Sequence, residues 1–92
     1  MSRHVDIYPY FHQEFTITVN GNQYRLELVW SDLNGWTALI WTKNTPLSYG
    51  RSLRLEVDLF DGLNVDFKLV PKGDKPTRDN LGKECLLVVE DV

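Results

Sequence analysis

The stretch FTITVNGNQYRLELVW, residues 15–30, decides the fold because two runs of alternating apolar and polar residues flank a turn sequence within it. Apolar residues occupy every second position from Glu14 to Val19, and the same alternation returns from Gln23 to Trp30. A period of two is typical of a half-buried β-strand, whose successive side chains point to opposite faces of a sheet. The stretch therefore predicts two amphipathic strands.

The connection between these runs predicts an antiparallel hairpin. A two-residue loop at Asn20-Gly21 pairs Ile17 with Tyr24, and a loop at Gly21-Asn22 shifts the register by two residues and keeps the same faces aligned. An ordinary three-residue loop would place the apolar face of one strand against the polar face of the other, unless a bulge absorbed the extra residue. The turn residues and the hydrophobic pattern therefore agree.

The rest of the chain is interpreted as four further strands with short connections. The expected elements are strands at residues 36–42, 50–57, 65–70 and 83–90, turns at 43–46 and 58–64, a charged loop at 71–76, and one helical turn at 77–81 capped by Thr77. The strand at 36–42 has apolar residues on both faces, with Trp36 and Trp41 on opposite sides, which is typical of a strand covered on both sides. In the strand at 50–57, the expected inward side chains are Leu53, Leu55 and Val57. About six strands without a long helix predict an all-β fold, a small antiparallel β-barrel or sandwich.

Length and composition fit one compact domain. The chain has 92 residues, of which 42% are hydrophobic and 25% charged, unlike the composition of disordered chains. No internal repeat and no Pro/Ser-rich linker divides it. We expect an N-terminal extension at residues 1–13 and a β-barrel body at residues 14–92.

The charge pattern argues against a specific nucleic-acid partner, because phosphate binding depends on clustered Lys and Arg residues. The formal net charge is -3, and the basic residues are scattered along the chain. No apolar run is long enough to cross a bilayer, and the first residues lack the apolar centre of a signal peptide. We expect no membrane partner and no export signal.

No group of residues predicts catalysis or a cofactor. The single cysteine, Cys85, lies in an alternating strand, where burial would keep its thiol protonated. His4 and His12 have no Cys or carboxylate at a spacing typical of a metal site, and no motif brings the loop aspartates together. The sequence therefore predicts no enzyme activity, no cofactor and no metal.

Aromatic residues give the strongest indication of an interaction surface. Tyr8, Tyr10 and Phe11 bring apolar surface to an extension that has little other reason to fold. This segment is expected either on a neighbouring chain or back on its own barrel. The candidate interaction residues are Tyr8, Tyr10, Phe11, Trp41, Tyr49 and Phe60.

Four segments, taken in order, resemble the phage baseplate plug family of contractile-tailed bacteriophages. These segments are FTITVNGNQYRLELVW, GWTALIW, PLSYGRSLRL and PTRDNLGKECLLVV, and the resemblance covers about residues 15–90. The family pattern tends to have a Gly-rich stretch after the fourth strand, whereas this chain reads RLEVDLFDGLN there, with Gly62 alone. The N-terminal extension is not part of the resemblance.

The resemblance implies a non-enzymatic structural component of the tail baseplate, made in the host cytoplasm and built into the virion. Copies of such a plug would fill the channel of the baseplate hub. The implied partners are the hub and other tail proteins, in a symmetric homo-oligomer for which a trimer is one arrangement. Deleting residues 1–12 is then expected to leave the body folded and to abolish incorporation.

Two other functions remain open at this stage. The first is a β-barrel module for a small ligand or carbohydrate, in which exposed Trp36, Trp41 or Tyr49 would stack on a flat apolar face of the ligand. The second is a small hydrolase or another enzyme of unknown type, which has little support because no nucleophile and base can be named. The ligand-binding hypothesis predicts full binding by a chain that lacks residues 1–12.

Overall fold

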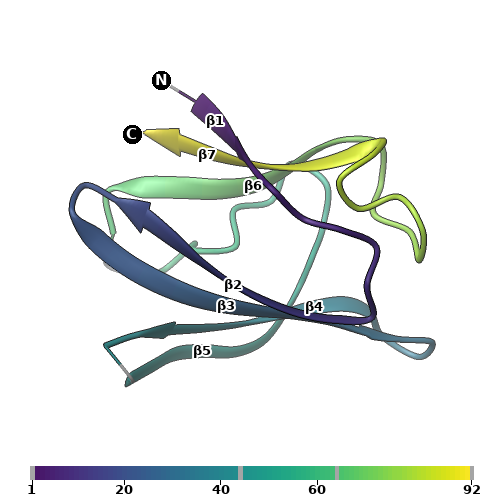
Figure 1. Ribbon diagram of the computed structural model, residues 1–92, viewed down its shortest axis with the longest axis horizontal. Coiled ribbons are helices and arrows are strands. Elements are labelled where there is room, and N and C mark those ends of the chain that lie inside the picture. The colour runs from purple at the N-terminus through teal and green to yellow at the C-terminus, as the bar shows by residue number, and fades with distance from the viewer. Residues whose placement is uncertain (1, 44, 64, 92) are drawn as a thin grey trace.

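The computed structural model describes residues 2–43, 45–63 and 65–91 and places them in two antiparallel β-sheets (Figure 1). The strands are β1 (Ser2–Val5), β2 (His12–Val19), β3 (Asn22–Ser31), β4 (Gly35–Thr42), β5 (Thr45–Ser52), β6 (Phe67–Gly73) and β7 (Cys85–Asp91). One sheet has the order β1-β7-β6, and the other has the order β2-β3-β4-β5. The two sheets face each other with the core between them, so the all-β prediction is confirmed in its sandwich form.

The hairpin of β2 and β3 forms through a two-residue turn. Asn20 and Gly21 have φ angles of 54° and 82°, the left-handed values that such a turn needs. Ile17 lies opposite Tyr24 as expected, and the pairing continues to His12 opposite Val29. The register buries the apolar face of the hairpin against the other sheet.

The strand expected at residues 50–57 is wrong in its position. The fourth strand of this sheet is β5, Thr45–Ser52, so it begins inside the turn expected at 43–46, of which residue 44 lies outside the described residues. After Ser52 the chain turns into the core through Leu53, whose N–H donates to the Trp36 carbonyl at 3.0 Å. Leu55 and Val57 were expected to point inward but are exposed. The segment leaves the sheet here, so the alternation of apolar and polar residues does not determine which side chains are buried.

The region after residue 65 differs from the expectation in two places. Pro71 lies within β6, opposite Leu87, and not in a loop; β6 is an edge strand, where a residue without an N–H is tolerated. The expected helical turn at 77–81 is absent in the described chain. A buried side chain organises this loop instead, since Asn80 Oδ1 accepts the Thr77 N–H at 2.8 Å and Asn80 Nδ2 donates to the Lys75 carbonyl at 2.9 Å.

The N-terminal segment packs on its own chain. β1 pairs with β7 from Ser2 opposite Glu90 to Val5 opposite Leu87, and Ile7 is buried in the core. Of the two placements expected for the extension, the structure shows the one on its own body for β1 and Ile7. The segment therefore completes the three-stranded sheet.

An aromatic cluster fills one part of the core. The ring centres of Phe60 and Phe67 lie 4.8 Å apart, and Tyr24 lies 5.5 Å from Phe60 with its ring nearly perpendicular. These distances are typical of favourable tilted and edge-to-face ring contacts. The cluster joins β3 of one sheet to β6 of the other.

Candidate interaction surfaces

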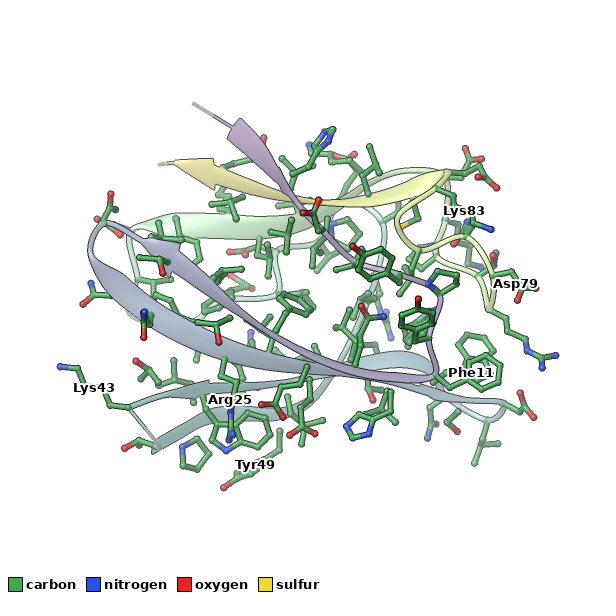
Figure 2. The ribbon with its side chains drawn as sticks, viewed as in Figure 1. Phe11, Arg25, Lys43, Tyr49, Asp79 and Lys83 are labelled. Atoms are coloured by element: carbon green, nitrogen blue, oxygen red, sulfur yellow. The ribbon has the colours of Figure 1, made fainter. Side chains whose placement is uncertain are left out.

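The segment between β1 and β2 presents three exposed aromatic side chains at one end of the sandwich. We call Tyr8, Tyr10 and Phe11 the aromatic loop; their side chains are 52%, 62% and 47% exposed. The Tyr8 and Tyr10 rings are stacked, with centres 5.4 Å apart and planes inclined by 22°. Figure 2 shows Phe11 at the same end of the molecule as Asp79 and Lys83.

Gln13, the second residue of β2, orders the aromatic loop through hydrogen bonds. Its Oε1 accepts the Tyr8 N–H at 3.1 Å, and its Nε2 donates to the carbonyl oxygens of Tyr8 and Tyr10. One side chain thus binds the backbone on both sides of Pro9. The exposed tyrosines are therefore carried by a loop with its own hydrogen bonds.

Two further contacts join the aromatic loop to the body. The Phe11 carbonyl accepts the Trp30 N–H at 2.8 Å, which continues the β2–β3 pairing by one residue. The Arg78 guanidinium carbon lies 4.9 Å from the centre of the Phe11 ring, a distance at which a cation and an aromatic face attract each other. Three connections, before β2, between β3 and β4, and before β7, gather at this end (Figure 1).

The turn between β3 and β4 adds an apolar side chain that the sequence analysis missed. Leu33 is 89% exposed, and its N–H donates to Ser31 Oγ at 3.2 Å. Trp30 Nε1 donates to Asp32 Oδ1 at 2.9 Å, which orders the start of the same turn. A lone Leu in a polar turn sequence is a weak signal, because single exposed apolar residues are common on protein surfaces.

The outer face of the four-stranded sheet carries Trp41. Arg25 lies over the Trp41 ring at 4.5 Å and also approaches Glu14 Oε1 at 3.6 Å. A hollow of about 190 Å³ lies beside this pair and is also lined by Lys43. Tyr49, on β5, is exposed, and Figure 2 shows it on the same side of the molecule as Arg25. Arg25 therefore covers one ring face of Trp41, which reduces the ring surface open to a flat ligand.

Two of the aromatic residues singled out from the sequence are core residues. Phe60 is 1% exposed and contacts Tyr24 and Phe67, so it does not present its ring to a partner in this conformation. Trp36 is buried too, and its Nε1 donates to the Thr77 carbonyl at 2.8 Å. Phe60 lies within residues 58–64, which were expected to form a turn, and this explains why it was taken for a surface residue.

The side chains considered for catalysis or metal binding do not form a cluster in the described structure. Cys85 is buried, and desolvation, followed by the nearby charge of Asp74, raises the pKa of its thiol. His12 Nε2 lies 3.2 Å from Glu27 Oε2 on the exposed face of the sheet. Within the described ranges, no three His, Cys, Asp or Glu side chains gather as metal ligands do, and no helix could cross a membrane.

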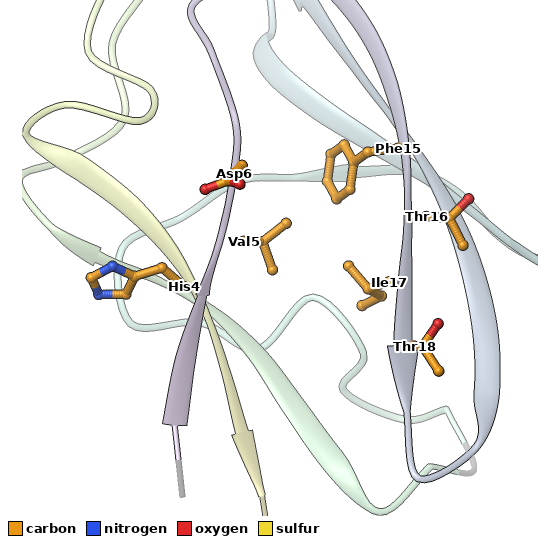
Figure 3. A pocket seen from close by; sticks show the side chains of 7 residues that line it. All are labelled: His4, Val5, Asp6, Phe15, Thr16, Ile17 and Thr18. Atoms are coloured by element: carbon orange, nitrogen blue, oxygen red, sulfur yellow. The ribbon is translucent and has the colours of Figure 1, made fainter.

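A groove separates β1 from β2, where the two sheets do not pair. Its volume is about 400 Å³, and its lining runs from His4 to Asp6 on one side and from Phe15 to Thr18 on the other. Figure 3 shows Val5 and Ile17 pointing toward each other from the two strands. The groove therefore lies between two strand edges.

The fold and these surfaces define the class of the protein: a small β-sandwich domain that presents ordered aromatic side chains and open strand edges. A family model described as "Cyanophage baseplate Pam3 plug gp18" matches residues 3–92. The chain therefore belongs to this family of phage baseplate plugs, and it is a structural component of the tail baseplate that associates with other baseplate proteins. No curated protein matches the sequence.

The match confirms the resemblance that the four sequence segments indicated, and it reaches further. It includes nearly all of the N-terminal segment, from residue 3 onward. This agrees with the structure, where β1 completes a sheet and Ile7 belongs to the core. The N-terminal segment is thus part of the family domain.

Proposed function

We propose that this chain plugs the central channel of the baseplate hub as a non-enzymatic part of the phage tail. The observation that carries the proposal is the aromatic loop, ordered by Gln13 and exposed at one end of a domain of the baseplate plug family. Plugging a channel requires a rigid shape and contact surface, and it requires no reacting group. The buried Cys85 fits a protein without a nucleophile.

The aromatic loop supports a protein partner for physical reasons. Aromatic side chains are enriched in protein interfaces, because each buries a large area and loses few rotamers on binding. The hydrogen bonds from Gln13 and the contact of Arg78 with Phe11 order the loop before a partner arrives. A surface ordered in advance loses less conformational entropy on association.

The proposed partners are the hub and other tail proteins. Within the assembly we propose a symmetric homo-oligomer, of which a trimer is one arrangement, made in the host cytoplasm and carried in the virion. The proposed partners include no specific nucleic acid and no membrane, because the small net charge of -3 and the scattered basic residues provide no phosphate-binding surface.

Quantitative mass spectrometry on purified tail particles tests the proposal. We expect a few copies of the chain per particle, in a fixed ratio to the hub proteins. Complete absence from intact particles that retain their hub proteins would overturn the proposed function. A number of copies close to that of the tube subunits would instead contradict a plug and indicate a repeated tube component.

A further inference from the structure

Two open sheets have four edge strands, and two of these edges are protected. The β6 edge is covered, because the Glu56 N–H donates to the Pro71 carbonyl at 2.9 Å and the Leu59 N–H donates to the Leu69 carbonyl at 2.8 Å. Asp58 Oδ1 accepts the Leu69 N–H at 2.9 Å in the same region. The segment after β5 thus closes this side of the sandwich.

The β5 edge is protected by its irregular shape. Its register against β4 shifts twice, and the strand contains Pro46 and a left-handed Gly50 with a φ angle of 67°. Bulges and proline keep a strand edge from pairing with another chain. β5 is therefore a poor template for an added strand.

From Glu14 to Ile17 the β2 edge has none of these protections in the described structure. All eight residues of β2 keep one regular register with β3, and the strand contains neither proline nor glycine. β2 lies at the end of the strand order, so no strand of the described chain pairs with its outer side. A long, regular and open edge is a template for strand addition.

The backbone groups that face this edge can be assigned. In an antiparallel pair, alternate residues direct both N–H and C=O toward the partner strand, and the residues between them direct these groups away. The Phe11 carbonyl bonds to the Trp30 N–H, so odd-numbered residues of this strand face β3. The N–H and C=O groups of Glu14 and Thr16 therefore point to the open edge.

The groove beside this edge has the shape and surface for one extended chain. Val5, Phe15 and Ile17 supply an apolar wall, of which Val5 and Phe15 are only partly buried (Figure 3). Side chains alternate along a strand, so every second residue of an added strand would reach this wall. β1 bounds the groove on its far side, so an added strand would lie between β1 and β2.

The groove also has an electrostatic preference. Asp6 lines it, is exposed, and has no ion-pair or hydrogen-bond partner among the described residues. Among the described residues that line it, none is a Lys or Arg. A cationic side chain of an added strand would pair with this carboxylate.

We propose that the β2 edge takes up an extended segment of another baseplate protein as an added strand. That segment carries apolar residues at alternate positions and a Lys or Arg opposite Asp6. A second copy of this chain fits the edge less well, because its own segments at 2–5 and 85–91 are already used in β1 and β7. This inference rests on the proposed function and names the mode by which the plug is held.

Hydrogen exchange on intact tail particles tests the inference against the isolated full chain. We expect the amides of Glu14 and Thr16 to exchange at least about tenfold more slowly in the particle, since an added strand would accept their hydrogen bonds. Unchanged exchange at both amides, in particles that contain the chain, would overturn strand addition and leave the plug function standing. Absence of the chain from the particles would overturn the plug function itself.

A matched pair of variants separates the backbone from the side chain. Thr16→Pro removes an N–H that points to the open edge and no bond to β3, whereas Thr16→Ala keeps the N–H. We expect the number of copies per particle to fall at least about tenfold for the proline variant and to stay near wild type for the alanine variant. Equal incorporation of both would contradict the inference.

Two further variants keep the test decisive. If Thr16→Pro fails to fold by circular dichroism, Asp6→Lys reverses the charge in the groove at an exposed position, and we expect it to lower incorporation severalfold more than Asp6→Ala does. Thr16→Cys tests for a second copy at the edge, because Cys85 is buried. A disulfide-linked dimer of Thr16→Cys in particles would show that two copies meet there, and would overturn the assignment to a different protein.

Discussion

The guanidinium carbon of Arg78 lies 4.9 Å from the centre of the Phe11 ring, which joins the connection before β7 to the connection before β2. Trp36 Nε1 donates a hydrogen bond to the Thr77 carbonyl, so the loop that carries Arg78 is also joined to the four-stranded sheet. The aromatic loop is therefore supported from both sheets. The exposed aromatic side chains of this loop therefore form an ordered surface.

Removing two aromatic rings should weaken assembly and leave the fold intact. Because Tyr8 and Phe11 are about half exposed, we expect Tyr8→Ala with Phe11→Ala to lower the free energy of unfolding by about 1 kcal/mol and to reduce incorporation into particles strongly. Circular dichroism and copy number per particle measure the two effects. Val57→Ala, which truncates another exposed apolar residue, is the control and should incorporate normally.

The hydrogen bonds of Gln13 should keep the aromatic loop ordered. We expect Gln13→Ala to speed hydrogen exchange at the Tyr8 amide and to lower the free energy of unfolding by about 1 kcal/mol, because three hydrogen bonds to the loop are lost. Gln13→Glu keeps the acceptor for the Tyr8 N–H and loses both donated bonds. Slow exchange at Tyr8 in the alanine variant would contradict this role.

Phe60 should behave as a core residue. We expect Phe60→Ala to lower the free energy of unfolding by about 3–5 kcal/mol, since its ring fills space between Tyr24 and Phe67. Tyr49→Ala, at an exposed ring, should change it by less than about 0.5 kcal/mol. Urea unfolding monitored by fluorescence compares the two, and equal effects would place Phe60 outside the core.

The structure changes the expected result of an N-terminal deletion. Removing residues 1–12 takes away β1, uncovers the outer edge of β7 and empties the position of Ile7 in the core. We therefore expect this deletion to destabilise the body by at least about 2–5 kcal/mol. Thermal unfolding measures this, and an unchanged midpoint would show that β1 contributes nothing to the sandwich.

Cys85 should make the stability depend on pH in the alkaline range. Its pKa is raised above the ordinary value of 9.0 in the folded chain, so the unfolded chain releases the thiol proton first as pH rises. The free energy of unfolding should then fall above pH 9.0, and this part of the fall should be missing in Cys85→Ala. Urea titrations of both proteins across this range measure the difference.

Local sequence signals predicted the parts of the fold that depend on neighbouring residues. The Asn20-Gly21 turn and the alternation on both sides of it determine the β2–β3 register without any distant contact. The pairing of β1 with β7 could not be predicted in this way, because Ser2–Val5 is short and its partner is the last strand of the chain.

The candidate interaction residues were predicted correctly as exposed only where the local sequence indicates exposure. Tyr8, Tyr10 and Phe11 were selected for their apolar surface in a polar segment, and all three are exposed. Phe60 was misplaced, because the chain between β5 and β6 runs along an edge that no local pattern reveals. The open edge of β2 depends on strand order, which is fixed only when the whole chain has folded.

The pairing of Ser2 with Glu90 brings the first and last strands together, and it sets how the domain would respond to mechanical load. β1 and β7 are antiparallel neighbours, and both described ends of the chain lie on the same side of the sandwich (Figure 1). A force that pulls these two ends apart acts along the hydrogen bonds between the strands and opens them one pair at a time, as in a zipper. The same sandwich loaded along its strands must break many bonds together. Tension on the ends would thus release β1 well before the rest of the domain yields.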